Sequence, residues 1–183
     1  MSNKFYISKD YHKTVLVLID FFGYTCTIDT FDNYLELYWR EISKYSGLSE
    51  AFMEVHQEDI IWHLISKHQK LSDSFIIAYE HKLNFKTLSR FQFLSENIMH
   101  KFSFSLDWDY ISQYQKLSEP FIKRFQNRVN WEYISKYQRL SESFLRKFQD
   151  KVYWSEIGKK ADFSDKFESE FYTQLDRKNN SYY

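Results

Sequence analysis

Side chains that commonly bind metals or catalyse reactions occur in this sequence, but their spacing does not suit that chemistry. His63 and His68 are five residues apart instead of the four that place two histidines on one helical face, and Cys26 is the single cysteine. Asp107 and Asp109 are two residues apart, and a helix would point them to different faces. We find neither a nucleophile beside a base nor a glycine-rich phosphate loop. The sequence therefore predicts no enzyme, no metal site and no cofactor.

Positive charges are the residues best placed to bind a partner. They recur late in one predicted helix of several repeats, and on a helical wheel they lie within about 140° of one another, opposite the apolar residues. Stacking of the repeats would align them into a positive stripe. The partner-binding candidates are Lys101, Lys123, Arg124, Arg128, Arg146, Lys147 and Lys151, with His100 beside them. Three interpretations stay open: a solvated outer face, a surface for an acidic protein, or contacts to nucleic-acid phosphates.

A 23-residue repeat builds most of the chain and must position these charges. Its anchor residues are Trp39, Trp62, Phe85, Trp108, Trp131 and Trp154, with no insertion between copies. A short fixed period is the signature of a solenoid, in which each unit buries its apolar side against its neighbours. Periodic aromatic residues usually form the core. We therefore assign these six anchors to the structural core in preference to a stacking platform for bases.

Each repeat is predicted to fold as two helices joined by capped corners. The first helix begins at the anchor, after Asn or Asp in three repeats, and the second follows a Ser that precedes an acidic residue. The N-cap candidates are Asn84, Asp107, Asn130, Ser49, Ser72, Ser95, Ser118, Ser141 and Ser164. Two caps per repeat leave helices of about 8–10 residues, which are marginal unless stacked. The expected fold is all-α, an α-solenoid of six 23-residue two-helix repeats with a non-repeat N-terminal cap.

Polar residues recur on the face of the first helix that we expect to be buried. Four glutamines there should bond to backbone groups of the corners, because a buried amide needs partners; they are Gln69, Gln92, Gln115 and Gln138. Five serines should let neighbouring helices approach closely; they are Ser43, Ser66, Ser89, Ser112 and Ser135. Tyr137 falls on the same predicted arc. Cations late in this helix suit its negative end; they are Lys44, Lys67, Arg90, Lys136 and Lys159.

The two ends of the chain depart from the repeat. Residues 1–28 do not match it and read as a buried strand or hairpin, or as an irregular helix, that covers the first unit. A helix is expected to start at Asp29 or Thr30 and lead into the array. We therefore divide the chain into an N-terminal cap (1–38), a six-repeat helical array (39–176) and a flexible tail (177–183). The last copy carries atypical residues, as terminal repeats do; they are Gly158, Lys160, Ala161 and Phe163.

Charge and composition limit the classes of partner. The 183 residues carry 25 basic and 25 acidic side chains, so global attraction to nucleic acid is not expected. The charge is uneven, because residues 1–61 have 5 basic against 10 acidic side chains and residues 62–152 have 15 against 9. That complementarity permits head-to-tail association of copies. The single cysteine favours a reducing compartment, and no apolar run approaches the roughly 20 residues of a membrane helix. We expect a soluble, cytoplasmic protein.

The repeat consensus W-x-x-I-S-x-x-Q-x-L-S-E-x-F-I-x-x-F-x-x-x-V-[ND]-W resembles the tandem repeats abundant in proteins of giant DNA viruses, with similar arrays in phage and bacterial proteins. Residues 108–154 carry it almost throughout and residues 39–107 more loosely. The resemblance implies a viral or mobile-element origin and a helical array, without a shared activity. We expect a non-enzymatic protein–protein interaction module that binds a host or viral protein. The alternatives are a nucleic-acid-binding array that uses the positive stripe, and a structural, self-assembling virion component.

Overall fold

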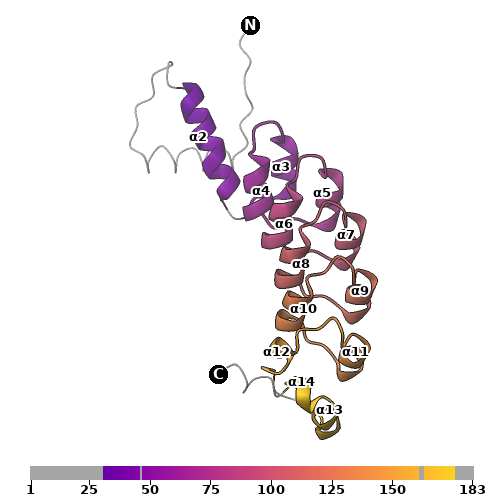
Figure 1. Ribbon diagram of the computed structural model, residues 1–183. Helices are drawn as coiled ribbons and strands as arrows, with labels where there is room; N and C mark the ends of the chain where they lie inside the picture. The colour runs from indigo at the N-terminus through magenta and orange to yellow at the C-terminus, as the bar shows by residue number, and fades with distance from the viewer. Residues whose placement is uncertain (1–30, 46, 161–162, 176–183) are drawn as a thin grey trace.

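The computed structural model describes residues 31–45, 47–160 and 163–175. Within these ranges the chain forms thirteen helices, α2 to α14, and no strand (Figure 1). The predicted all-α repeat solenoid is confirmed. The cap expected at residues 1–28 and the tail expected at residues 177–183 lie outside the described ranges.

Each unit contains two helices, which we call its A helix and its B helix. The A helices are α2 (Phe31–Lys44), α4 (Trp62–His68), α6 (Phe85–Phe91), α8 (Trp108–Tyr114), α10 (Trp131–Tyr137) and α12 (Trp154–Ile157). The B helices are α3 (Glu50–Val55), α5 (Asp73–Ala78), α7 (Glu96–Lys101), α9 (Glu119–Arg124), α11 (Glu142–Lys147) and α13 (Asp165–Glu170). A short helix, α14 (Tyr172–Leu175), follows the last unit.

The helices after α2 are shorter than the predicted 8–10 residues, since α8 has 7 residues and α9 has 6. Helix α8 ends because its C-cap, Gln115, adopts an extended conformation with φ −92° and ψ 148°. Helix α9 ends at Phe125, whose φ of −103° and ψ of 26° begin the next corner. Helices of one to two turns are unstable alone, so contacts between units must hold them.

The predicted N-caps are confirmed. Ser118 Oγ accepts a hydrogen bond from the Phe121 N–H of α9 at 3.3 Å. The equivalent serine does the same at the start of α3, α5, α7, α11 and α13. The side-chain oxygens of Asn84, Asp107 and Asn130 cap α6, α8 and α10. Each bond satisfies a backbone N–H that the first helical turn leaves without a partner.

The units stack into an arc, with the A helices along its inner side and the B helices along its outer side (Figure 1). Successive A helices pack directly on one another from α2 to α12. The core lies between the two layers, where Ile111 of α8 and Ile122 of α9 are both 0% exposed. Burying such a side chain completely contributes about 1.5–3 kcal/mol relative to leaving it in water. This repeated apolar layer is the main source of stability that each unit shares with its neighbours.

The anchor aromatic residues lie at the edge of this core. Trp39 is buried, whereas Trp62, Phe85, Trp108, Trp131 and Trp154 are partly buried and pack against the core. The Trp108 ring lies 4.9 Å from the Phe125 ring, measured between centroids, and its Nε1–H donates to the carbonyl oxygen of Ser103 at 2.9 Å. Trp62, Trp131 and Trp154 make the same kind of bond to the residue five positions earlier. Each indole thus has an apolar side in the core and a polar edge in the corner.

Glutamine side chains join each unit to the preceding one. Gln115 Nε2 donates to the carbonyl oxygens of Ser89, at 3.1 Å, and Gln92, at 2.7 Å. Its Oε1 accepts the Leu94 N–H at 3.0 Å. Gln69, Gln92 and Gln138 make corresponding donor bonds. The predicted bonds from these glutamines to corner backbone are confirmed, and they form a ladder along the array that satisfies buried backbone groups.

The small serine of each A helix has a bonding role as well as a small volume. Ser112, which is 0% exposed, donates its Oγ–H to the Trp108 carbonyl oxygen at 2.7 Å. It also accepts the Asn130 N–H, from the last residue before the next A helix, at 2.9 Å. Ser43, Ser66, Ser89 and Ser135 accept the corresponding N–H. The expectation of close helix approach is therefore incomplete, because a residue of the same size without the hydroxyl would leave a partly buried donor without this acceptor.

The last unit ends the stack with different contacts. A Cβ added to Gly158 would lie 3.0 Å from the Leu175 carbonyl oxygen, so the glycine lets α14 pack closely on α12. Lys160 Nζ donates to the Gln138 carbonyl oxygen at 2.6 Å, a bond that a glutamine amide makes in the earlier units. Burial lowers the pKa of Lys160. Lys160 thus replaces a donor bond of the glutamine ladder at the point where the stack stops.

Candidate interaction surfaces

The seven predicted partner-binding cations lie on or just after the B helices α7, α9 and α11, and their contacts divide them into two groups. Arg128 belongs to the first group, because its Nη1 donates to the Ser103 carbonyl oxygen at 2.7 Å and its guanidinium lies 4.0 Å from the Phe104 ring centroid. Lys151 occupies the same position one unit later, and its Nζ donates to Gln126 Oε1 at 3.1 Å. Both cations fix a corner of the preceding unit.

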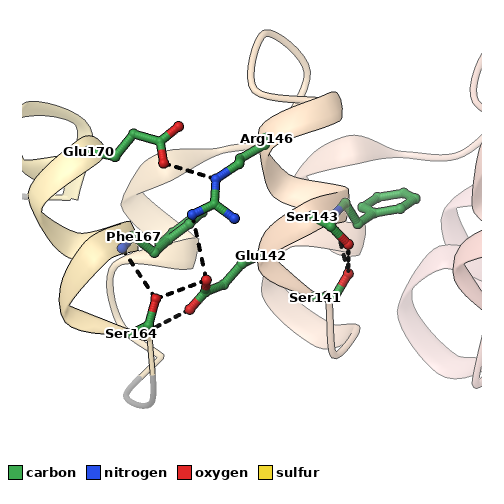
Figure 2. Close-up of polar contacts among 8 residues, drawn as sticks. Ser141, Glu142, Ser143, Arg146, Ser164, Phe167 and Glu170 are labelled. Atoms are coloured by element: carbon green, nitrogen blue, oxygen red, sulfur yellow. Dashed lines mark hydrogen bonds and ion pairs between the residues drawn. The ribbon is translucent and has the colours of Figure 1, made fainter.

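Arg146 is the third cation held by internal contacts, as Figure 2 shows. Its Nε donates to Glu170 Oε2 at 2.9 Å, and its Nη2 lies 3.6 Å from Glu142 Oε2. Glu142 also accepts the N–H and Oγ–H of Ser164, at 2.6 and 3.0 Å. The backbone bond from Ser164 is the largest cause of a lowered pKa at Glu142, and Arg146 adds to it. This cluster therefore joins α11 to α13.

The other four cations have no acidic partner among the described residues and are exposed. We call them the outer patch; it consists of Lys101, Lys123, Arg124 and Lys147. Lys123 and Lys147 come from adjacent units and approach each other. The neighbouring ammonium group of Lys123 lowers the pKa of Lys147 by charge repulsion. The outer patch therefore concentrates like charges that the protein itself does not neutralise.

A second surface, which the sequence analysis did not recognise, lies on the A helices. Phe91, Tyr114 and Tyr137 end successive A helices and are 46%, 45% and 46% exposed. Tyr110 and Tyr133 lie one turn earlier, each with its ring centroid 6.0 Å from that of the terminal tyrosine. By the helical wheel these rings occupy the side of the A helix away from the B layer. The A helices line the inner side of the arc, so this side of each A helix faces inward (Figure 1).

The prediction that Tyr137 is buried is wrong. Consecutive residues of a helix lie about 100° apart, so Tyr137 points well away from the buried Gln138. Its ring therefore falls beyond the part of α10 that the two helical layers cover. The exposed position is aromatic in three consecutive units. This 23-residue recurrence of rings outside the core was the signal available in the sequence.

Cations accompany these rings. Lys67 Nζ lies 5.2 Å from the Phe91 ring centroid, and the Arg90 guanidinium lies 5.0 Å from the same centroid. Arg90 also lies 5.4 Å from the Tyr110 ring, and Lys136 Nζ lies 5.3 Å from the Tyr137 ring. These cations were predicted only to suit the helix end. We call the combined surface the inner strip; it consists of Lys67, Arg90, Phe91, Tyr110, Tyr114, Tyr133, Lys136 and Tyr137.

Other kinds of site find no support in residues 31–45, 47–160 and 163–175. No group of three or more His, Cys, Asp or Glu side chains in these ranges could hold a metal ion. Burial and the neighbouring Lys67 and Lys44 lower the pKa of His68. Among the described helices, none is long and apolar enough to cross a membrane. No family model, curated protein or solved structure matches the chain. Inference about function therefore rests on the two surfaces.

Proposed function

We propose that this protein is a non-enzymatic interaction module that binds an acidic surface of a protein partner through the outer patch. The observation that carries the proposal is that Lys101, Lys123, Arg124 and Lys147 are exposed on three successive B helices and form no ion pair in the described structure. Elsewhere on the same layer the cations are paired, as Arg146 is with two glutamates. Like charges held together by a rigid stack favour a partner of opposite charge.

Nucleic acid is a weaker candidate for this particular surface. Three of the seven cations predicted to form the stripe, Arg128, Arg146 and Lys151, are committed to contacts within the protein. The four that remain would neutralise few phosphates, and phosphate contacts supply most of the affinity of nonspecific binding. A protein partner is therefore the better match for the outer patch.

Charge reversal tests this proposal. Partners would be captured from host and infected-cell lysates, because the repeat resembles viral arrays, and the best candidate would be purified. Its affinity would be measured for the native chain, for an outer variant (Lys101→Glu, Lys123→Glu, Arg124→Glu, Lys147→Glu) and for a control with four exposed cations changed away from the outer patch (Arg40→Glu, Lys70→Glu, Lys116→Glu, Arg139→Glu). We expect the outer variant to lose association rate and affinity, because steering by complementary charge acts on encounter, while the control retains both. Equal loss in the two variants would refute a role for the outer patch.

A further inference from the structure

The inner strip calls for an explanation that the outer patch does not provide. Its rings recur once per unit on neighbouring A helices, and about half of each terminal ring is open to water. Monomeric proteins rarely leave a continuous row of aromatic side chains exposed without a use for it. Because A helices pack side by side, consecutive rings are separated by one interhelical spacing, about 8–10 Å. The result is a regular row of flat apolar surfaces along the inner side of the arc.

The charges beside the rings show which ligand chemistry fits. Lys67, Arg90 and Lys136 contact rings of the strip, and none of them forms a salt bridge within the described residues. Two residues after the ends of α4, α8 and α10 lie further exposed cations that form no salt bridge within the described residues; they are Lys70, Lys116 and Arg139. Rings that can stack on bases, alternating with cations that can contact phosphates, are the two components of a sequence-tolerant single-strand binding surface.

We propose that the inner strip binds single-stranded nucleic acid, with bases stacked on Phe91, Tyr114 and Tyr137 and with phosphates near Lys67, Arg90 and Lys136. In a duplex the bases are paired and stacked about 3.4 Å apart, so they cannot reach rings about 8–10 Å apart. A single strand can splay its bases out, and helical arrays can take one base per unit. The existing contacts between cations and rings are weak at exposed sites, so a base can replace them.

An acidic peptide is the competing occupant of the strip. It would satisfy the cations, but its carboxylates would leave the row of ring faces unused. The spacing of the rings would then have no role in binding. Experiments must therefore separate the contribution of the rings from that of the charges.

The test uses the full chain and a fluorescein-labelled oligothymidylate of about 16 nucleotides, the upper end of common single-strand site sizes. Fluorescence anisotropy would give its dissociation constant at about 50 and 200 mM salt, together with that of the matching duplex. We expect the single strand to bind more tightly than the duplex and to weaken steeply with salt. We expect Tyr114→Ala and Tyr137→Ala each to weaken binding about tenfold, as loss of one stacked base does.

Three controls make the result specific. Tyr114→Phe and Tyr137→Phe keep the ring and should bind as the native chain does, which separates stacking from any effect on folding. Lys136→Glu should weaken binding and reduce its salt dependence. Lys123→Glu combined with Lys147→Glu changes the outer patch and should have little effect at about 0.15 M salt, where charges more than about 8 Å apart are screened. This last variant also separates the inner strip from the function proposed for the outer patch.

Each of three results would overturn the proposal. The first is no measurable binding of the single strand by the native chain. The second is binding that the two alanine substitutions leave unchanged. The third is displacement of the oligonucleotide by unlabelled polyglutamate as effectively as by unlabelled oligothymidylate, which would identify the strip as a site for an acidic protein.

Discussion

Replacing Gln115 by leucine should destabilise the array strongly, although leucine is more apolar and the site is almost fully buried at 4% exposure. The side chain makes three hydrogen bonds to the preceding unit. Its amide donates to the carbonyl oxygens of Ser89 and Gln92, and its oxygen accepts the Leu94 N–H. Leucine can make none of these bonds, so three backbone groups near the core lose these partners at once.

The size of the effect follows from these three bonds. Leaving a buried polar group unsatisfied costs about 1–3 kcal/mol, and burial of a leucine side chain offsets about 1.5–3 kcal/mol of the total. We therefore expect a net loss of about 3 kcal/mol in the free energy of unfolding. For a chain of this length, that loss corresponds to a fall of about 6–12 °C in melting temperature. The expected loss is large beside the 5–15 kcal/mol that stabilises most proteins.

The assay is urea unfolding followed by circular dichroism, with Gln113→Leu as the matched control. Gln113 is two residues away on the same helix, and its one side-chain hydrogen bond in the described structure is a 3.5 Å contact to the Tyr137 hydroxyl. The control should change stability by less than about 0.5 kcal/mol, as surface substitutions usually do. If Gln115→Leu is as stable as the native chain, the glutamine ladder does not join the units and our interpretation of it is refuted.

Three further substitutions test other contacts between and within units. Ser112→Ala should cost about 1–3 kcal/mol in chemical unfolding because it leaves the partly buried Asn130 N–H without this acceptor, whereas the exposed Ser105→Ala should be neutral. Ser118→Ala should lower stability by about 1 kcal/mol through the lost N-cap of α9, and an unchanged thermal melt would show that the cap contributes nothing. Glu142 has a lowered pKa in the folded chain, so its contribution is complete above its ordinary value of 4.5 and is lost as the pH falls through the lowered value. The stability difference between the native chain and Glu142→Gln should therefore shrink when melts are repeated below pH 4.5, and a difference that does not change with pH would contradict the contact with Ser164.

The repeat itself made much of the fold predictable. The recurrence of Ser118 and Asp107 fixes where helices begin, because a cap bond involves residues only two or three positions apart. The buried glutamines were predictable because an amide on an apolar face requires partners. Helix lengths were overestimated because the extended turn at Gln115 depends on the unit before it, and the same stacking gives Ser112 its bond to Asn130. Contacts that exist only between stacked units cannot be derived from the periodicity of one helix.

The candidate surfaces were less predictable than the fold. A helical wheel places Arg128 and Arg146 on the outer face, but it does not show that Ser103 and Glu170 already bind them, since those partners lie 24 or 25 residues away. The wheel also assigned Tyr137 to the core, because the width of the buried arc depends on how far the neighbouring helices extend around it. Burial and pairing of surface residues are properties of the assembled array.

Hydrogen exchange at the corner amides tests most directly whether the units are joined as described. Leu94, Leu117, Asp107 and Asn130 donate their N–H groups to side chains of neighbouring units, at 2.9–3.1 Å. None of the four lies within a helix, so a chain of independently formed helices would leave these amides unprotected. Exchange followed by NMR in the native chain should show them protected to a degree similar to Ile111, inside α8. Exchange at the rate of an unfolded peptide at these four amides, with Ile111 protected, would contradict the stacked, side-chain-linked array.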